Sequence, residues 1–247
     1  MKSISSIQNP EIKDIAQLQT AKGRHTQNKF IAEGIRVCST LIASNVKLVQ
    51  IYATQANKDY VYALANEEKV TLVTEQVMNK ISASASPSGI LGVFAIPKRP
   101  EFKDLTQGLV LSQISDPGNM GTLIRTCIAM GVKTIVKIEG ADIWSPKVVQ
   151  ATAGTIGQVN IFDISWAELV KNQGLLKLCA LVVFGGQNPQ EIDFTNTLMV
   201  VGNEANGIPA EWVDQCQEKL TLPMPGNTES LNAAIAGSIA LYLAFNK

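Results

Sequence analysis

The 247-residue sequence predicts an α/β fold built from two domains. A length of this size with 46% hydrophobic side chains is enough for one large or two small cores. In both halves short apolar β-rich runs alternate with helical patterns, which is typical of α/β proteins. Two prolines in the stretch Pro97–Pro100 interrupt regular structure, so we place a linker there. The predicted domains are residues 1–98 and residues 99–247.

The first half is expected to be a small α/β domain. Apolar spacing predicts a helix over 35–42, and helical patterns recur at 59–65 and 75–81. Short runs rich in β-branched and aromatic residues predict strands at 47–53, 70–73 and 90–96.

The second half is expected to form a mostly parallel sheet with helices on both faces. Apolar runs that read as buried strands lie at 109–114, 134–138, 178–184, 198–201 and 219–222. Helix starts are marked by Ser145-Pro146, by a capping box from Ser165 to Glu168, and by Ser230, which is expected to cap a final helix that runs to about Phe245.

Composition excludes several classes of protein. With 21 basic and 21 acidic residues, the chain cannot hold nucleic acid as an unstructured polycation. Its four cysteines have no zinc-finger spacing and are expected to be reduced. A single histidine, His25, disfavours hydrolase triads and most zinc sites. No targeting or membrane-spanning segment is evident, so we expect a soluble cytoplasmic protein.

The neutral total hides an uneven distribution of charge. Residues 1–98 carry 11 Lys and Arg against 7 Asp and Glu, whereas residues 99–247 carry 10 against 14. The first half is therefore the place to expect a polyanionic partner. The basic residues Lys22, Arg24, His25, Lys29 and Arg36 lie within fifteen positions and are candidate RNA contacts, or else an ordinary solvated basic face.

Three segments of the second half combine glycines with polar side chains. They cover residues 116–126, 201–209 and 222–232. Each follows an apolar strand and precedes a helix, which is where ligands bind in open α/β sheets. The chain has no common phosphate-binding glycine motif, so one site shared by these three segments is the simplest interpretation.

The first segment places Arg125 six residues after Asn119, where its guanidinium could bind a phosphate. The alternative is a surface arginine that pairs with Asp116. Cys127 has no histidine near it in sequence and is interpreted as a packing residue.

The other two segments contribute a carboxylate and a helix start. Glu204 stands between Gly202 and Gly207, where it either contacts a substrate or orders the loop. Ser230 and Asn232 flank a helix start, where free backbone N–H groups attract polar ligands, although Ser230 could be only a cap.

Together these segments resemble the three motifs of the SpoU (SPOUT superfamily) RNA ribose 2′-O-methyltransferases. The matching residues are Asn119-x-Gly121-x-x-x-Arg125, Gly202-x-Glu204-x-x-Gly207, and Pro223-Met224-Pro225-Gly226 followed by Ser230-Leu231-Asn232. In the first half, residues 30–36 and 88–93 are similar to the family's optional substrate-binding domain, which resembles ribosomal RNA-binding proteins of the kink-turn type.

The resemblance implies a fold, a cofactor and a partner. The fold is a C-terminal domain with a trefoil knot, one of the rare exceptions to unknotted topology. The cofactor is S-adenosylmethionine, held mostly through the backbone by residues that align with the family's contacts: Gly202, Leu222, Met224 and Leu231. Phe184 and Gly185, at another strand end, are further candidate contacts. The family also works as a homodimer, for which the apolar helix after Leu231 could serve as the interface or could equally be core.

The resemblance further implies methyl transfer to a ribose 2′-OH, with no metal. The family proposal makes Arg125 the base, yet a guanidinium does not deprotonate in proteins. We therefore expect Arg125 to hold a phosphate and stabilise developing charge, while Asn119, Glu204, Ser230 and Asn232 orient the ribose and the loops. Ribosomal RNA is favoured over transfer RNA by analogy. Alternatives are an inactive RNA-binding member of the fold and a small-molecule enzyme.

Overall fold

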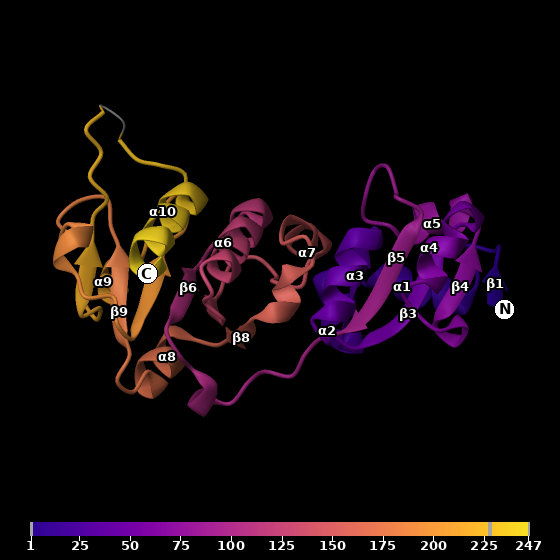
Figure 1. Ribbon diagram of the computed structural model, residues 1–247, viewed down its shortest axis with the longest axis horizontal. Helices are drawn as coiled ribbons and strands as arrows, with labels where there is room; N and C mark the ends of the chain where they lie inside the picture. Colours follow the sequence, from indigo (N-terminus) through magenta and orange to yellow (C-terminus); the bar gives the residue numbers. More distant parts are fainter. Residues whose placement is uncertain (1, 227–228, 247) are drawn as a thin grey trace. The chain divides into compact units, whose positions relative to one another are not determined.

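The structure, a computed structural model, describes residues 2–226 and 229–246 (Figure 1). Residues 227 and 228 of the third polar segment lie outside the described residues. The chain divides into two compact units, one of Met1–Lys98 with Trp144–Gly157, the other of Arg99–Ile143 with Gln158–Lys247. The first break falls inside the Pro97–Pro100 stretch. The segment Trp144–Gly157 belongs to the first unit, which a single cut of the sequence does not foresee.

The first unit is a five-stranded mixed sheet with helices on both faces. Its strands are β1 (Lys2–Ile4), β2 (Lys29–Glu33), β3 (Leu48–Ala53), β4 (Val70–Val73) and β5 (Ile90–Ala95), in the order β1-β4-β3-β5-β2. Its helices are α1 (Pro10–Gln17), α2 (Ala21–Gln27), α3 (Ile35–Ala43), α4 (Lys58–Tyr62), α5 (Glu75–Ile81) and α7 (Pro146–Ala151). Strand β5 is antiparallel to both of its neighbours.

Each face of this sheet has its own core. On one face, α1 and α5 pack Ile12 and Met78 against strand residues such as Leu91. Another cluster contains Phe30, whose ring stacks on Phe94 at 5.7 Å and lies 4.8 Å from the ring of Trp144. The Trp144–Gly157 segment therefore adds an aromatic ring to the first unit's own core.

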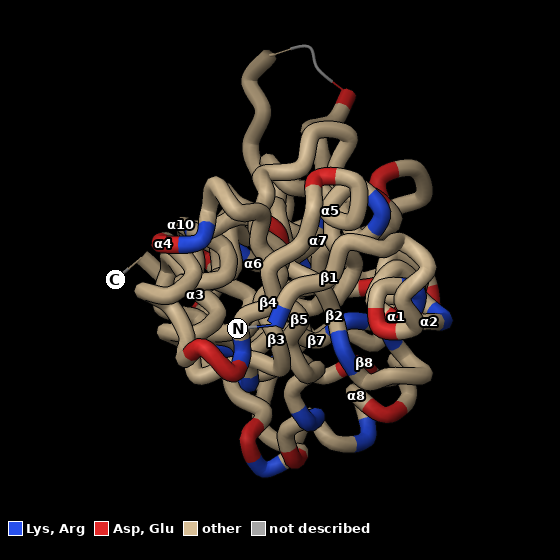
Figure 2. Tube along the Cα trace, turned by 90° about the vertical axis from the view of Figure 1, so that its right-hand side faces the viewer, with Lys and Arg blue, Asp and Glu red and all other residues tan. Residues whose placement is uncertain are grey.

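Basic and acidic residues are interleaved around α1 and α2, so this part of the first unit has no uniformly basic face (Figure 2). Lys22 and Arg36 are exposed and Lys29 is half-buried. Arg24 is 3% exposed, and its Nη1 donates a hydrogen bond to the carbonyl of Leu18 at 2.8 Å. The expectation that Arg24 contacts RNA is thus wrong for the folded chain, because a buried guanidinium that holds the α1–α2 turn does not reach a surface ligand.

The second unit is built on a six-stranded sheet in which every strand pair is parallel. Its strands are β6 (Gly108–Ser112), β7 (Thr134–Ile138), β8 (Asn160–Asp163), β9 (Lys177–Leu181), β10 (Thr197–Val201) and β11 (Glu218–Leu220), in the order β11-β9-β10-β6-β7-β8. Its helices are α6 (Pro117–Ala129), α8 (Trp166–Asn172), α9 (Ala210–Val213) and α10 (Ala233–Phe245). The expected doubly covered parallel sheet is confirmed.

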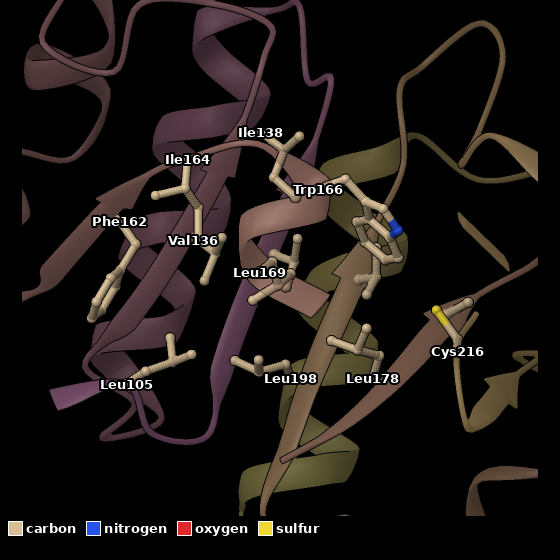
Figure 3. Packing of buried hydrophobic residues seen from close by; sticks show 13 residues of the cluster. Leu105, Val136, Ile138, Phe162, Ile164, Trp166, Leu169, Leu178, Leu198 and Cys216 are labelled. Atoms are coloured by element: carbon tan, nitrogen blue, oxygen red, sulfur yellow. The ribbon is translucent and has the colours of Figure 1, made fainter. Parts of the chain in front are cut away.

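One face of this sheet packs against α8 (Figure 3). Leu169 and Trp166 from α8 lie over strand residues that include Val136, Leu178 and Leu198. The Trp166 ring stacks on Trp212 with centroids 4.9 Å apart and planes 3° apart, which extends the same core onto α9.

The other face is covered by α6 and α10, and a glycine allows their close approach. A Cβ on Gly237 would lie 2.5 Å from Leu123 Cδ2 and 3.1 Å from Val201 Cγ2, so no larger residue fits without displacement. The hydroxyls of Thr126 and Ser238 are 2.9 Å apart and add a polar link between the two helices. Within the described residues no helix is long and apolar enough to cross a membrane.

The marked helix starts are confirmed except for the last. Ser145 and Ser165 are N-caps, and Ser165 forms the expected capping box with Glu168. The expectation that Ser230 caps the final helix is wrong, because α10 starts at Ala233 and its N-cap is Asn232. Asn232 Oδ1 accepts hydrogen bonds from the backbone N–H groups of Ala234 and Ile235, so it satisfies the first free donors of the helix.

Candidate active site

A cavity opens at the carboxyl ends of β9 and β10, where the three polar segments of the second unit lie. Its volume is about 360 Å³, within the range of small-molecule sites. Its walls combine apolar side chains with loop backbone and polar groups. They come from the ends of β9 and β10, from the loop 202–207, and from the segment that leads into α10, including Leu222, Met224, Ser230, Leu231 and Ala236.

Most of the predicted cofactor contacts line this cavity. Gly202, Leu222, Met224 and Leu231 do so, together with Ser230 and Glu204 from the predicted catalytic set. Phe184 and Gly185 are not among the lining residues, and the Phe184 side chain is 81% exposed. At this strand end Val182 and Val183 face the cavity instead. Apolar runs alone do not show where a strand ends, and β9 ends at Leu181, earlier than expected.

The Glu204 carboxylate joins the loop after β10 to the loop after β6. Its Oε2 accepts hydrogen bonds from the Ser115 backbone N–H and hydroxyl, at 3.2 and 2.9 Å. Its Oε1 accepts from the Asp116 N–H at 3.2 Å and from Asn119 Nδ2 at 2.9 Å. Four donors thus converge on one carboxylate, which supports the loop-ordering interpretation of Glu204.

These donors also determine the protonation state of Glu204. Partial burial by itself would raise the pKa of this carboxyl, but the hydrogen bonds from Asn119, Ser115 and the loop backbone outweigh it and lower the pKa to about 2. Glu204 is therefore ionised at neutral pH. A carboxylate with so low a pKa is a poor proton acceptor for a hydroxyl group.

Asn119 joins the third polar segment to the other two. Its Oδ1 accepts a hydrogen bond from Asn232 Nδ2 at 3.2 Å, while its Nδ2 is bound to Glu204. Both polar atoms of the Asn119 amide are thus used, and the orientation of the group is determined by its partners. Asn119, Glu204 and Asn232 form a continuous chain of side chains across three loops.

Asn203 and Ser115 also support this chain, and neither was predicted from the sequence. Asn203 Nδ2 donates to the Gln113 carbonyl at 2.8 Å and lies 3.4 Å from the Ser115 hydroxyl. Asn203 Oδ1 accepts from the backbone N–H groups of Ala205 and Asn206. Only their positions in the sequence could have indicated this role, since Asn203 directly precedes Glu204 and Ser115 directly precedes Asp116 in polar loops.

Arg125 lies in α6, two turns after the Asp116 cap, and its side chain is exposed. Within residues 2–226 and 229–246 its guanidinium has no hydrogen-bond or ion-pair partner. Asp116, the alternative partner, instead accepts a hydrogen bond from the Asn119 backbone N–H at 2.8 Å. Arg125 therefore keeps all its donors for an external ligand.

The cysteines take no part in this site. All four are buried free thiols, and Cys127 packs inside α6, where burial raises its pKa far above the usual range. A thiol that stays protonated is a weak nucleophile, so the interpretation of Cys127 as a packing residue is confirmed.

The parallel-sheet unit that carries this cavity and these three loops has the fold of a class of methyltransferases. A solved structure of an AdoMet-bound rRNA methyltransferase from Sinorhizobium meliloti superposes with a TM-score of 0.88 at 27% identity, covering 98% of this chain and 97% of that one. A family model described as the SpoU rRNA Methylase family matches residues 107–242, and one described as an MRM3-like substrate binding domain matches residues 9–92. The chain belongs to the SpoU rRNA methylase family.

Relatives match along almost the whole length. The chain is 31% identical to an uncharacterised tRNA/rRNA methyltransferase of Synechocystis sp., over 98% of this chain and 93% of that protein. It is 27% identical to the 23S rRNA (guanosine(2553)-2′-O)-methyltransferase RlmP of Bacillus subtilis, over 98% of both chains. Both matches therefore extend over both units of this chain.

Proposed function

We propose that this protein transfers the methyl group of S-adenosylmethionine to a ribose 2′-OH of large-subunit ribosomal RNA. The observation that carries the proposal is the chain of side chains from Asn232 through Asn119 to Glu204, which joins the family's three motifs beside one cavity. The Bacillus subtilis relative, described as a 23S rRNA 2′-O-methyltransferase, supports both the ribose position and the ribosomal substrate.

The cavity fits S-adenosylmethionine in size and chemistry. Leu222, Met224 and Leu231 supply apolar wall for an adenine-like ring, and the loop 202–207 supplies backbone donors and acceptors. Gly202 has no room for a side chain, because a Cβ there would lie 2.4 Å from the Gly207 carbonyl carbon. Glycine at this position therefore allows the backbones of residues 202 and 207 to lie close together, which fixes the shape of the loop that lines the cavity.

The chemistry requires positioning more than acid–base catalysis. When bound, S-adenosylmethionine supplies an activated sulfonium methyl group. Arg125 binds the phosphate next to the target ribose and stabilises the charge that develops on its 2′-oxygen. Asn119 and Asn232 hold the loops in register, and Ser230 faces the cavity as a hydrogen-bonding group for the ribose.

The 2′-OH proton leaves to the neighbouring phosphate or to water. Glu204 is ionised but has a pKa of about 2, so it does not compete for that proton. A guanidinium does not act as a base in proteins, so Arg125 does not accept the proton. Catalysis therefore does not depend on a side-chain base within the described part of this site.

We also propose that the protein acts as a homodimer through α10. This helix buries Gly237, Ala240 and Leu241 against its own unit, yet leaves Ile239 and Tyr242 at 41% and 54% exposed. The further exposed apolar residues of this face are Leu231, Ile235 and Leu243. Because Leu231 also lines the cavity, a second copy on this face would border the active site.

The test of the proposal is transfer of labelled methyl groups to separated ribosomal and transfer RNA from cells that lack the modification. We expect incorporation into large-subunit ribosomal RNA, and loss of incorporation in Arg125→Ala. Incorporation into transfer RNA alone would contradict the proposal that ribosomal RNA is the substrate. Binding of S-adenosylmethionine without transfer to any RNA would favour an inactive RNA-binding member of the fold.

A further inference from the structure

The first unit contains a groove to which the proposed function assigns no role. Two hollows of about 510 and 430 Å³ share Glu33, Gly34, Ser88 and Gln150 in their walls, so they form one continuous depression. The walls come from the start of α3, from α4, from the serine-rich loop 82–89 and from α7. We call this depression the α3 groove.

The charge of the α3 groove is positive. Arg36 and Lys147 line it, and both are exposed. Glu33 is the acidic residue in these walls, and its two carboxylate oxygens accept hydrogen bonds from the Ser82 hydroxyl at 2.8 Å and the Ala83 backbone N–H at 2.7 Å. The loop 82–89 thus binds the Glu33 carboxylate by hydrogen bonds, whereas the two cations are exposed to solvent and suit a polyanion.

An aromatic side chain lies in the same walls. Tyr60 from α4 lines the α3 groove and is 63% exposed, so its ring is open to a ligand in the groove. Exposed rings beside cations are the common platform on which proteins stack unpaired bases of single-stranded nucleic acid. Gln150, also exposed, adds an amide that can bond to a base edge or a 2′-OH.

We propose that the α3 groove binds a single-stranded segment of the RNA substrate, with phosphates at Arg36 and Lys147 and an unpaired base on Tyr60. This inference rests on the proposed function, since it concerns how that enzyme holds its RNA. It places the main RNA contact of the first unit on α3, α4 and α7. The basic residues of α2 contribute less, because Arg24 is buried and the preceding helix α1 carries Glu11 and Asp14.

The test measures binding of a fluorescein-labelled oligouridylate of about 20 nucleotides to the full chain at several salt concentrations. The double variant Arg36→Gln/Lys147→Gln removes two phosphate contacts, so the slope of log affinity against log salt is expected to fall by about 1.4. Tyr60→Ala is expected to weaken binding by about tenfold with little change in slope. The matched control Lys13→Gln/Lys80→Gln removes two exposed charges elsewhere in the same unit and is expected to behave as wild type.

Two results would contradict RNA binding by the α3 groove. One is an unchanged slope in the Arg36/Lys147 variant, and the other is an equal fall in the Lys13/Lys80 control. Circular dichroism and S-adenosylmethionine affinity, expected to be unchanged in all variants, exclude misfolding as the cause. A methyl-transfer assay separates this proposal from the proposed function. If the wild-type protein transfers methyl groups to RNA but the groove variants bind RNA normally, only RNA binding by the α3 groove is contradicted.

Discussion

Asn119 Nδ2 donates a hydrogen bond to Glu204 Oε1 at 2.9 Å, across 85 positions of sequence. The same Asn119 amide accepts from Asn232 through its oxygen, so a single side chain holds the two other motif loops. Each of the three residues is bound by the others or by backbone N–H groups, whereas Arg125 has no partner among the described residues and can bind the substrate. In the described part of the site, positioning residues thus surround the loops, while the Arg125 guanidinium has no protein partner.

Asn232 has two roles that substitution can separate. Asn232→Ser keeps an N-cap oxygen for α10 but loses the donor to Asn119, so we expect near wild-type thermal stability and at least tenfold slower methyl transfer. Asn232→Ala loses both roles and should also lower the free energy of unfolding by about 1 kcal/mol. Equal activity of Asn232→Ser and wild type would show that the Asn119 contact is not needed.

Glu204→Gln removes the charge on which four donors converge. The folded-state pKa is lowered from 4.5 to about 2, so this group contributes stability that is present above about pH 4.5 and is lost as the pH falls toward 2. Because the carboxylate is largely exposed, solvent screening limits the contribution to the order of 1 kcal/mol. Urea unfolding between pH 2 and 5 should therefore show a smaller acid-induced loss of stability in Glu204→Gln than in wild type.

The exposed acid Glu211 on α9 provides the control for that comparison. Glu211→Gln removes the same charge without touching the loops, and its acid unfolding should follow that of wild type. An identical pH profile for Glu204→Gln and wild type would mean that the four hydrogen bonds do not depend on ionisation.

Arg125 should tolerate neither loss nor simple replacement of its charge. Arg125→Ala is expected to reduce kcat by about two orders of magnitude, as loss of a group that stabilises developing charge does in other enzymes. Arg125→Lys keeps the charge but not the planar fork and should recover only part of the rate. Lys133→Ala, which removes an exposed charge elsewhere in the same unit, serves as the control. Full activity of Arg125→Lys would remove the need for bidentate binding.

Gly202→Ala should impair cofactor binding. The added Cβ would lie 2.4 Å from the Gly207 carbonyl carbon and 2.5 Å from the Ile208 nitrogen, so the loop must shift away from its position in the cavity wall. We expect at least tenfold weaker binding of S-adenosylmethionine by calorimetry, measured alongside the melting temperature. Unchanged affinity in a folded variant would place the cofactor elsewhere.

The exposed face of α10 should hold two copies of the chain together. Ile239→Asp introduces a charge on that face and is expected to yield monomers in sedimentation velocity, with lower activity because the partner borders the cavity. Leu175, which is 93% exposed on the loop before β9, supplies the control substitution Leu175→Asp. A monomeric wild-type protein would contradict the dimer.

Strong apolar periodicity made most of the second unit predictable, but not all of it. Five strands were foreseen, whereas β8 was missed because only Ile161 and Phe162 are apolar in its four residues. In the first unit β1, α1, α2 and β2 were missed, since short or polar elements such as α2 carry little periodicity. The trefoil knot implied by the family resemblance stays a prediction.

The sequence predicted which residues form the site better than it predicted the hydrogen bonds between them. The motifs predicted that Gly202, Glu204 and Ser230 share one site, and all three line the cavity. The motifs did not predict that the N-cap of α10 is Asn232 and not Ser230. The burial of Arg24 was not predicted either, because its position in a basic stretch does not indicate the hydrogen bond that it donates to the Leu18 carbonyl. Contacts between loops depend on tertiary geometry that a single sequence does not contain.

The most direct test of the central claim is alkaline hydrolysis of large-subunit ribosomal RNA after transfer of labelled methyl groups by the wild-type enzyme. Alkali cleaves RNA through the 2′-hydroxyl, so a methyl group on that oxygen protects the adjacent bond. We predict that the label appears in alkali-stable dinucleotides and is absent when Arg125→Ala replaces the wild-type enzyme. Label released in mononucleotides would place the methyl group on a base and contradict ribose methylation.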